Sequence, residues 1–207
     1  MQNKIVSASA ASPSLIYQPR SIVERLPLEE LFSQSRPLEI ELGSGDGTFL
    51  VEYAGLHPEC NFLGVERLLG RLRKIDRKGR RAGLTNLRVM RLEASYVVEY
   101  LLPPGCVSAM HIYFPDPWPK RKHTWKRLIN KPFTALAARV LASGGTVYLR
   151  TDNADYFAQM TSAFGDNTLF QAVDTPAELR ERLTDFERDF LARGVETLRA
   201  AYRRAPA

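Results

Sequence analysis

A single carboxylate stands in an unusual setting near the middle of the chain. Asp116 lies between Pro115 and Pro117, and Trp118 follows directly. Because proline fixes φ and pushes the residue before it towards extended conformations, Asp116 should sit on a stiff turn. The apolar residues 109–113 before it predict a short buried strand. The carboxylate would then project from the C-terminal end of a strand, where open α/β sheets bind their ligands.

Positive charge gathers in two segments of the chain. Residues 120–131 hold six Lys or Arg residues and no acid, with Trp125 among them, and residues 67–81 hold eight against a single acid. With a net charge of +6, such clusters are typical of a protein that binds a polyanion. A solvated helix face is the alternative for residues 67–81. The other run begins just after Asp116, so it favours a functional turn over a solvated carboxylate on a plain proline turn.

A glycine-rich turn follows the first predicted strand, residues 37–42. It runs from Gly43 to Gly47 as G-x-G-x-G, and glycine lets the backbone approach a nucleotide closely. Thr48 stands where a dinucleotide fingerprint needs its third glycine, which disfavours an NAD-dependent enzyme. Glu41 and Asp46 crowd the turn with acids, which would repel a pyrophosphate but suit the amine and sulfonium of S-adenosylmethionine. A tight structural turn would also use glycines.

Acids end the next two predicted strands as well. Glu66 follows residues 60–65, about 20 residues after the glycine turn, where a carboxylate accepts hydrogen bonds from both ribose hydroxyls of a nucleoside. An exposed Glu at a strand end is the alternative. Glu93 follows residues 87–92 and is in position to meet an adenine ring.

The order of the predicted elements gives the fold class. Strands are expected at 37–42, 60–65, 87–92, 109–113, 146–150, 169–173 and 195–202, and helices at 48–54, 68–82, 96–102, 128–141 and 155–164. Five βα units in succession predict an α/β protein with a Rossmann-like, doubly wound, mostly parallel seven-stranded sheet and helices on both faces. The last strand arrives without a crossover helix and should be antiparallel. The charged residues 176–193 should cover the top of the sheet.

The length of 207 residues suits one such domain, at residues 37–207, preceded by a segment at 1–36. That segment is expected to hold a polar tail to Ser14 and a short helix within 22–32. No apolar run is long enough for a membrane span and no signal-peptide core is visible, so a cytoplasmic protein is expected. Three scattered histidines do not indicate a metal site. Nothing in the sequence requires a protein partner.

The sequence resembles the bacterial tRNA (guanine-N7-)-methyltransferase family, which has a class I methyltransferase fold and uses S-adenosylmethionine. The resemblance covers roughly residues 37–200, and its F-P-D-P-W-x-K element is far more specific than the glycine turn. The segments that carry it are 41–47, 64–66, 114–123 with 126–128, 151–153 with 156–157, and 183–187 with Phe190 and Gly194.

The resemblance implies methyl transfer to N7 of a guanosine in the variable loop of tRNA, with Asp116 as the catalytic residue. Cofactor contacts are expected at Glu41, Gly43, Gly45, Glu66, Glu93 and Asp116. Substrate contacts are expected at Lys120, Asp152, Thr184, Asp185, Phe186 and Glu187. Contacts to RNA phosphates are expected at Arg121, Lys122, Lys126 and Arg127.

The chain departs from the family's pattern at three places. Position 93 is more usually Asp, so the cofactor contact of Glu93 is in question. Thr124 and Trp125 replace residues that are commonly charged, which alters the grip on the RNA backbone. Asp185 stands where Glu or Lys is more usual.

The chemistry of guanine N7 needs few catalytic groups. N7 carries an in-plane lone pair at neutral pH, so no base has to remove a proton before attack, and alignment is the main cost. A fixed carboxylate at Asp116 can stabilise the positive charge that develops on the imidazole ring. Two alternatives remain: a class I methyltransferase acting on another RNA base or a protein amine, and a non-catalytic RNA-binding module. Trp118 in place of a second proline disfavours the first, and intact Glu41, Glu66 and Asp116 disfavour the second.

Overall fold

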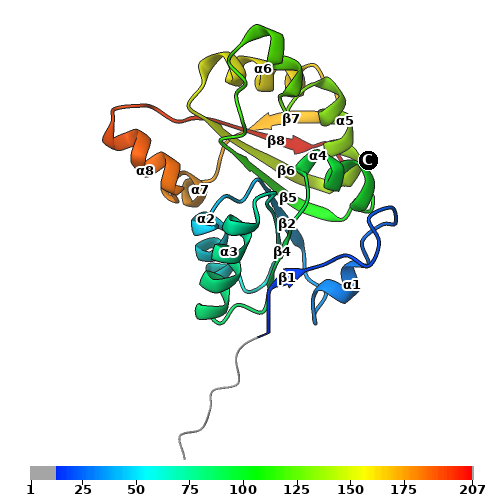
Figure 1. The fold of residues 1–207 in the computed structure, drawn as a ribbon. Helices are drawn as coiled ribbons and strands as arrows, with labels where there is room; N and C mark the ends of the chain where they lie inside the picture. Colours follow the sequence, from blue (N-terminus) through cyan, green and yellow to red (C-terminus); the bar gives the residue numbers. More distant parts are fainter. Residues whose placement is uncertain (1–12, 207) are drawn as a thin grey trace, which may run out of the picture.

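The computed structural model describes residues 13–206, and eight strands form one sheet in the order β1-β4-β3-β2-β5-β6-β8-β7 (Figure 1). The strands are β1 Ile16–Tyr17, β2 Leu38–Leu42, β3 Asn61–Val65, β4 Leu87–Met90, β5 Val107–Tyr113, β6 Leu141–Thr151, β7 Phe170–Val173 and β8 Leu198–Arg204. Strands β1 to β6 pair in parallel, whereas β8 is antiparallel to β6 and β7. The doubly wound, mostly parallel sheet and its antiparallel last strand are confirmed.

The eighth strand is β1, which the sequence prediction of seven strands leaves out. Two residues are too few to show a hydrophobic period, but they pair in parallel with Val89 and Met90 of β4. Residues 13–36 also bury Leu15, Leu26 and Leu31. Residues 1–12 of the predicted polar tail lie outside the described residues.

Helices cover both faces of the sheet (Figure 1). They are α1 Leu28–Leu31, α2 Thr48–Leu56, α3 Leu69–Arg81, α4 Ala94–Tyr96, the π-helix η1 Val97–Leu101, the 3₁₀-helix η2 Arg121–Lys126, α5 Lys131–Val140, α6 Ala154–Gly165, α7 Ala177–Glu181 and α8 Asp185–Ala192. Residues of α2, α3 and α7 form one buried apolar cluster, and residues of η1, α5 and α6 belong to the other. Within residues 13–206, no helix has the length and apolar character needed to cross a lipid bilayer.

The centre of the sheet sets the position of the site. β2 lies between β3 and β5. The chain continues from β2 to β3 and β4 on one side and then to β5 and β6 on the other, which leaves a crevice at the C-terminal ends of β2 and β5. Gly43, Gly45 and Gly47 follow β2 with φ of 81°, 55° and 79°, a left-handed conformation that glycine adopts without strain. At Gly64 of β3, a Cβ would lie 2.5 Å from a Leu50 methyl group, so only glycine lets α2 pack this closely.

Candidate active site

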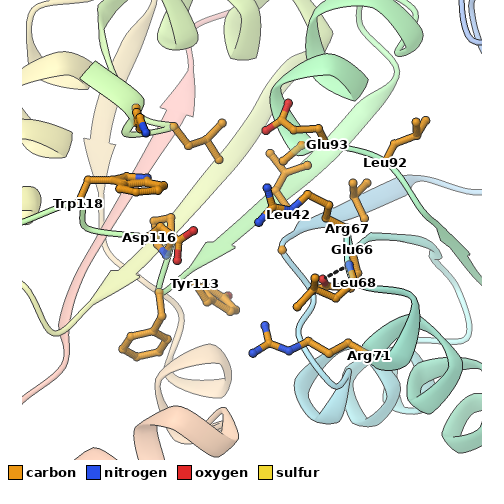
Figure 2. A pocket seen from close by; sticks show the side chains of 17 residues that line it. Leu42, Glu66, Arg67, Leu68, Arg71, Leu92, Glu93, Tyr113, Asp116 and Trp118 are labelled. Atoms are coloured by element: carbon orange, nitrogen blue, oxygen red, sulfur yellow. Dashed lines mark hydrogen bonds between the residues drawn. The ribbon is translucent and has the colours of Figure 1, made fainter. Parts of the chain in front are cut away.

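A cavity of about 460 Å³ opens at the C-terminal ends of β2, β3, β4 and β5 (Figure 2). Each strand contributes one of the predicted site residues to its lining: Gly43, Glu66, Glu93 and Asp116. The structure therefore brings together four residues that are widely separated in the sequence. Tyr113 and Trp118 complete the wall beside Asp116 in Figure 2.

A smaller hollow of about 30 Å³ adjoins this cavity and shares Tyr113 and Phe114 with it. The predicted site residues in its lining are Glu41, Gly45, Thr184, Asp185 and Phe186. The start of α8 thus lies against the glycine turn, and the hydroxyl of Thr48 donates to Asp185 Oδ2 over 2.7 Å. The predicted substrate segment therefore meets the predicted cofactor turn directly.

The loop that carries Asp116 has a strained backbone. Phe114 has φ of 51° and Trp118 has φ of 43°, and they are the non-glycine residues with positive φ in the described part of the chain. Bulky residues avoid this region, at a cost of about 1–3 kcal/mol each. Such a conformation persists only where the surrounding structure holds it in place.

Contacts at both ends of the loop keep Phe114 and Trp118 in these conformations. The backbone N–H of Phe114 donates to the carbonyl of Arg150 over 2.9 Å, and the Phe114 ring packs against Phe190 of α8 at 5.5 Å between centroids. At the other end, the Lys126 ammonium lies 4.7 Å from the centroid of the Trp118 ring. These contacts hold both ends of the turn that carries Asp116.

Arg127, expected among the RNA phosphate contacts, points into the protein instead. Its side chain is 3% exposed; Nε donates to the carbonyl of Pro117 over 2.7 Å, and the other nitrogens reach Gln159 at 2.8 Å and Asp155 at 2.5 Å. The guanidinium also lies 4.9 Å from the centroid of the Tyr156 ring. We therefore assign Arg127 to positioning the Asp116 loop, because its donors are directed at protein acceptors.

Asp116 itself is exposed, and within residues 13–206 its carboxylate has no hydrogen-bond or ion-pair partner. Trp118 and Phe114 on either side are fixed by their neighbours, so the carboxylate is held at the cavity mouth with its lone pairs free. A carboxylate in this state is ready to accept hydrogen bonds or to face a positive charge.

The two acids of the neighbouring strand ends also support the local backbone. Glu66 accepts hydrogen bonds from the backbone N–H groups of Gly45 over 3.0 Å and Leu68 over 2.7 Å. Glu93 caps α4 by accepting from the N–H of Tyr96 over 2.9 Å. Each carboxylate oxygen has two lone pairs, so both residues retain acceptor capacity towards the cavity.

Glu41 is buried at the end of β2, and its Oε2 atom has no hydrogen-bond partner among the described residues. Burial raises the pKa of this carboxyl group from 4.5 to about 8, against a smaller opposing effect of its Ser44 hydrogen bond and the Arg150 charge. An unpartnered buried acceptor next to a glycine turn is the kind of atom that a ligand's ammonium group would satisfy.

Two of the predicted substrate residues, Thr184 and Glu187, instead form a capping box at the start of α8. Glu187 is fully buried, with Oε2 2.7 Å from Arg150 Nη1 and Oε1 2.8 Å from Arg199 Nη2. Its carboxylate therefore accepts hydrogen bonds from the start of α8 and from one arginine each of β6 and β8. Both residues hold the start of α8 in place, and neither lines the larger cavity.

The remaining predicted residues lie on the surface near the cavity. Lys120, Arg121 and Lys122 are exposed at the start of η2, and Asp152 is exposed at the end of β6. None of the four lines the cavity, whereas Lys126 does. The arrangement gives a cationic rim on one side of an acid-lined pocket.

Three arginines at the site, Arg67, Arg71 and Arg150, are not among the site residues predicted from the sequence. Arg67 and Arg71 line the cavity opposite Asp116 in Figure 2, and Arg150 is buried beneath it with its guanidinium 4.0 Å from the centroid of the Tyr113 ring. A charge inside the apolar strand 146–150 is the signal that could have indicated Arg150, because such a residue needs a buried partner.

Comparison with known proteins shows the family of the chain. The putative methyltransferase family matches residues 35–200 of the chain. The tRNA (guanine-N(7)-)-methyltransferase of Sodalis glossinidius is 35% identical over 167 residues, which is 78% of this chain and 70% of that protein. The protein of the same name from Halorhodospira halophila is 36% identical over 87% of this chain and 80% of that protein. The chain belongs to the tRNA (guanine-N(7)-)-methyltransferase family.

Solved structures show the same fold at lower identity. The 16S rRNA methyltransferase KamB has a TM-score of 0.62 and 16% identity, covering 88% of this chain and 95% of that chain. TrmN from Thermus thermophilus has a TM-score of 0.58 and 18% identity, covering 86% of this chain and 47% of that chain. The Rossmann-like methyltransferase fold is confirmed.

S-adenosylmethionine, the methyl donor of such enzymes, fits the residues present. The unpartnered Oε2 of Glu41 suits its ammonium group, and Glu66 suits its ribose hydroxyls. Gly43 and Gly45 have open space where a Cβ would be, so the backbone can approach a ligand. Glu93 can meet the adenine. Within residues 13–206 no group of His, Cys, Asp or Glu side chains could hold a metal ion.

The buried ion pair between Arg150 and Glu187 should stabilise the folded protein. Replacing Glu187 with Ala leaves Arg150 buried without its partner, and we expect the free energy of unfolding to fall by about 3–5 kcal/mol. Asp189→Ala is the matched control, because this exposed acid of the same helix has no ion-pair partner in the described part of the chain. Urea denaturation of both variants measures the difference. Similar losses in both would show that the ion pair does not support α8.

The raised pKa of Glu41 predicts a pH-dependent stability. The Glu41 carboxyl group binds its proton more tightly in the folded protein than in the unfolded chain. The contribution of Glu41 to stability is therefore fully present below pH 4.5 and is lost as the pH rises to about 8. Glu41→Gln removes this dependence because the amide stays neutral. Thermal unfolding without cofactor, from about pH 5 to about pH 9, should show the variant gaining on the wild type as pH rises. Glu52→Gln, on the exposed side of α2, serves as control; parallel curves for wild type and Glu41→Gln would contradict the assignment.

Proposed function

We propose that this protein transfers the methyl group of S-adenosylmethionine to N7 of a guanosine in the variable loop of tRNA, in the cytoplasm. The observation that carries the proposal is the unpartnered carboxylate of Asp116, fixed on a strained turn between an acid-lined cavity and a cationic rim. The names of the relatives from Sodalis glossinidius and Halorhodospira halophila support the same reaction and substrate.

The catalytic role falls on Asp116 because of the charge that the reaction creates. When bound, S-adenosylmethionine supplies an electrophilic methyl group on a sulfonium centre. The guanine ring becomes cationic as N7 is methylated, and the Asp116 carboxylate stabilises that charge without having to reorient. It also accepts hydrogen bonds from the guanine N1–H and amino group, which sets the ring orientation. No side chain needs to act as a general base, since N7 carries no proton.

The rim provides the contacts to RNA. The exposed Lys120, Arg121 and Lys122 meet phosphates, and Lys126 lies at the edge of the cavity where a phosphate of the target nucleotide would pass. The guanosine has to leave its stack to reach Asp116, and the ring of Trp118 in the cavity wall offers a surface for it.

The predicted substrate segment of α8 divides into two roles. Phe186 is half exposed and lies, with Asp185, at the hollow beside the glycine turn, so these two residues are placed to contact substrate. Thr184 and Glu187 act through them by fixing the start of the helix. Asp152, exposed after β6, contacts the target loop or orients Lys120.

The first test of the function replaces Asp116 with Ala. We expect methyl transfer to fall by about a hundred- to a thousandfold, because a preorganised charge partner is lost, while tRNA binding changes little. The assay uses unmodified tRNA transcripts with labelled S-adenosylmethionine and identifies 7-methylguanosine in the product.

A transcript with its variable-loop guanosine replaced provides the substrate control, and Asp174→Ala, an exposed acid outside both cavities, provides the protein control. A fully active Asp116→Ala protein, or methylation of a different base, would overturn the assignment.

The cationic rim predicts the salt dependence of tRNA binding. Replacing Lys120 and Arg121 with Ala should reduce the slope of log Kd against log salt by about 1 to 2, because each phosphate contact releases counterions. Arg36→Ala with Arg203→Ala removes the same charge away from η2, because Arg36 precedes β2 and Arg203 pairs with Thr146 in the middle of β6. Filter binding at several salt concentrations measures both. A slope that changes equally in the two proteins would move the RNA surface away from η2.

A further inference from the structure

The 3₁₀-helix η2 exposes a tryptophan that the proposed chemistry does not use. Trp125 has 75% of its surface exposed, more than any large apolar side chain near the cavity. Leaving an aromatic ring of this size in water forfeits the favourable free energy of burying it. A partner that covers the ring would recover this free energy.

The ring is held in one orientation next to the cavity. Its indole N–H donates to the carbonyl of Lys122 over 3.1 Å, which fixes the ring on the helix. The Lys126 ammonium lies 5.5 Å from the Trp125 ring centroid and 4.7 Å from that of Trp118, which lines the cavity. One cation thus contacts both an aromatic of the cavity wall and the exposed aromatic outside it.

The charge around the ring selects the kind of partner. Residues 117–131 contain six Lys or Arg residues and no acid, so the surface attracts a polyanion. A partner with both negative charge and flat apolar groups is a nucleic acid whose bases are unstacked. Single-stranded loops of RNA present such bases, and aromatic side chains recognise them by stacking.

We propose that Trp125 stacks on a nucleobase that neighbours the target guanosine in the tRNA loop. The proposal rests on the proposed function, which places the target guanosine at Asp116. Drawing that base into the cavity removes a stacking partner from the bases beside it, and the fixed indole ring replaces the lost contact. Lys126 between the two rings then meets the phosphate that joins the two nucleotides.

The affinity test compares Trp125→Ala with Trp125→Phe. Stacking on one base is worth about 1–3 kcal/mol, so the alanine variant should raise Kd and KM for tRNA by about 5- to 150-fold with little change in kcat. Phe keeps an aromatic face and should keep most of the affinity. The salt slope should stay that of the wild type, because no charge is removed. Leu169→Ala, which removes an exposed apolar side chain before β7, is the control.

Fluorescence reports the stacking itself, because Trp118 and Trp125 are the two tryptophans of the chain. In Trp118→Phe, Trp125 is the single emitter, and saturating tRNA should quench it and protect it from acrylamide. Binding of tRNA with unaltered Trp125 emission, or a Trp125→Ala protein with wild-type affinity, would overturn the proposal and assign the ring to another partner. Quenching of Trp125 in a protein that yields no 7-methylguanosine would overturn the proposed function and keep the stacking contact.

Discussion

The buried ion pair between Arg150 and Glu187 is the constraint on which the site depends. Arg150 belongs to β6, and besides Glu187 its guanidinium contacts the carbonyl of Arg182 and the face of the Tyr113 ring. Its own carbonyl accepts the hydrogen bond that begins the Asp116 loop at Phe114. Burying two charges is costly unless every donor and acceptor is used, and here Arg199 and the capping box use the rest of Glu187. One network therefore joins the sheet, helix α8 and the loop that carries Asp116.

Two local features of the protein without ligand are unfavourable in free energy. The loop holds Phe114 and Trp118 in strained conformations, and Glu41 buries an acceptor without a partner. The interactions of the folded protein offset both free-energy costs before any ligand binds. The loop and Glu41 therefore need not rearrange when a ligand arrives. The strained loop places the Asp116 carboxylate at the cavity, and the unpartnered oxygen of Glu41 favours a ligand that brings an ammonium group.

The sequence predicts the elements with local signals and misses those set by distant contacts. Most strands and helices, the glycine turn and the proline turn at Asp116 follow from periodicity, glycine and proline, all of which act over a few residues. Arg127 and Lys126 look alike in a basic run, and only the long-range acceptors Asp155 and Gln159 decide that one of them points inward. Glu187 likewise pairs with Arg150 and Arg199, which no sequence period relates to it.

The segment 120–127, which contains the short helix η2, has an inner and an outer side. Arg127, at its end, holds the carbonyl of Pro117 and so fixes the residue next to Asp116. Lys120, Arg121, Lys122 and Trp125 face solvent on the same segment. The proposed RNA surface and the arginine that positions the Asp116 loop therefore belong to one short segment.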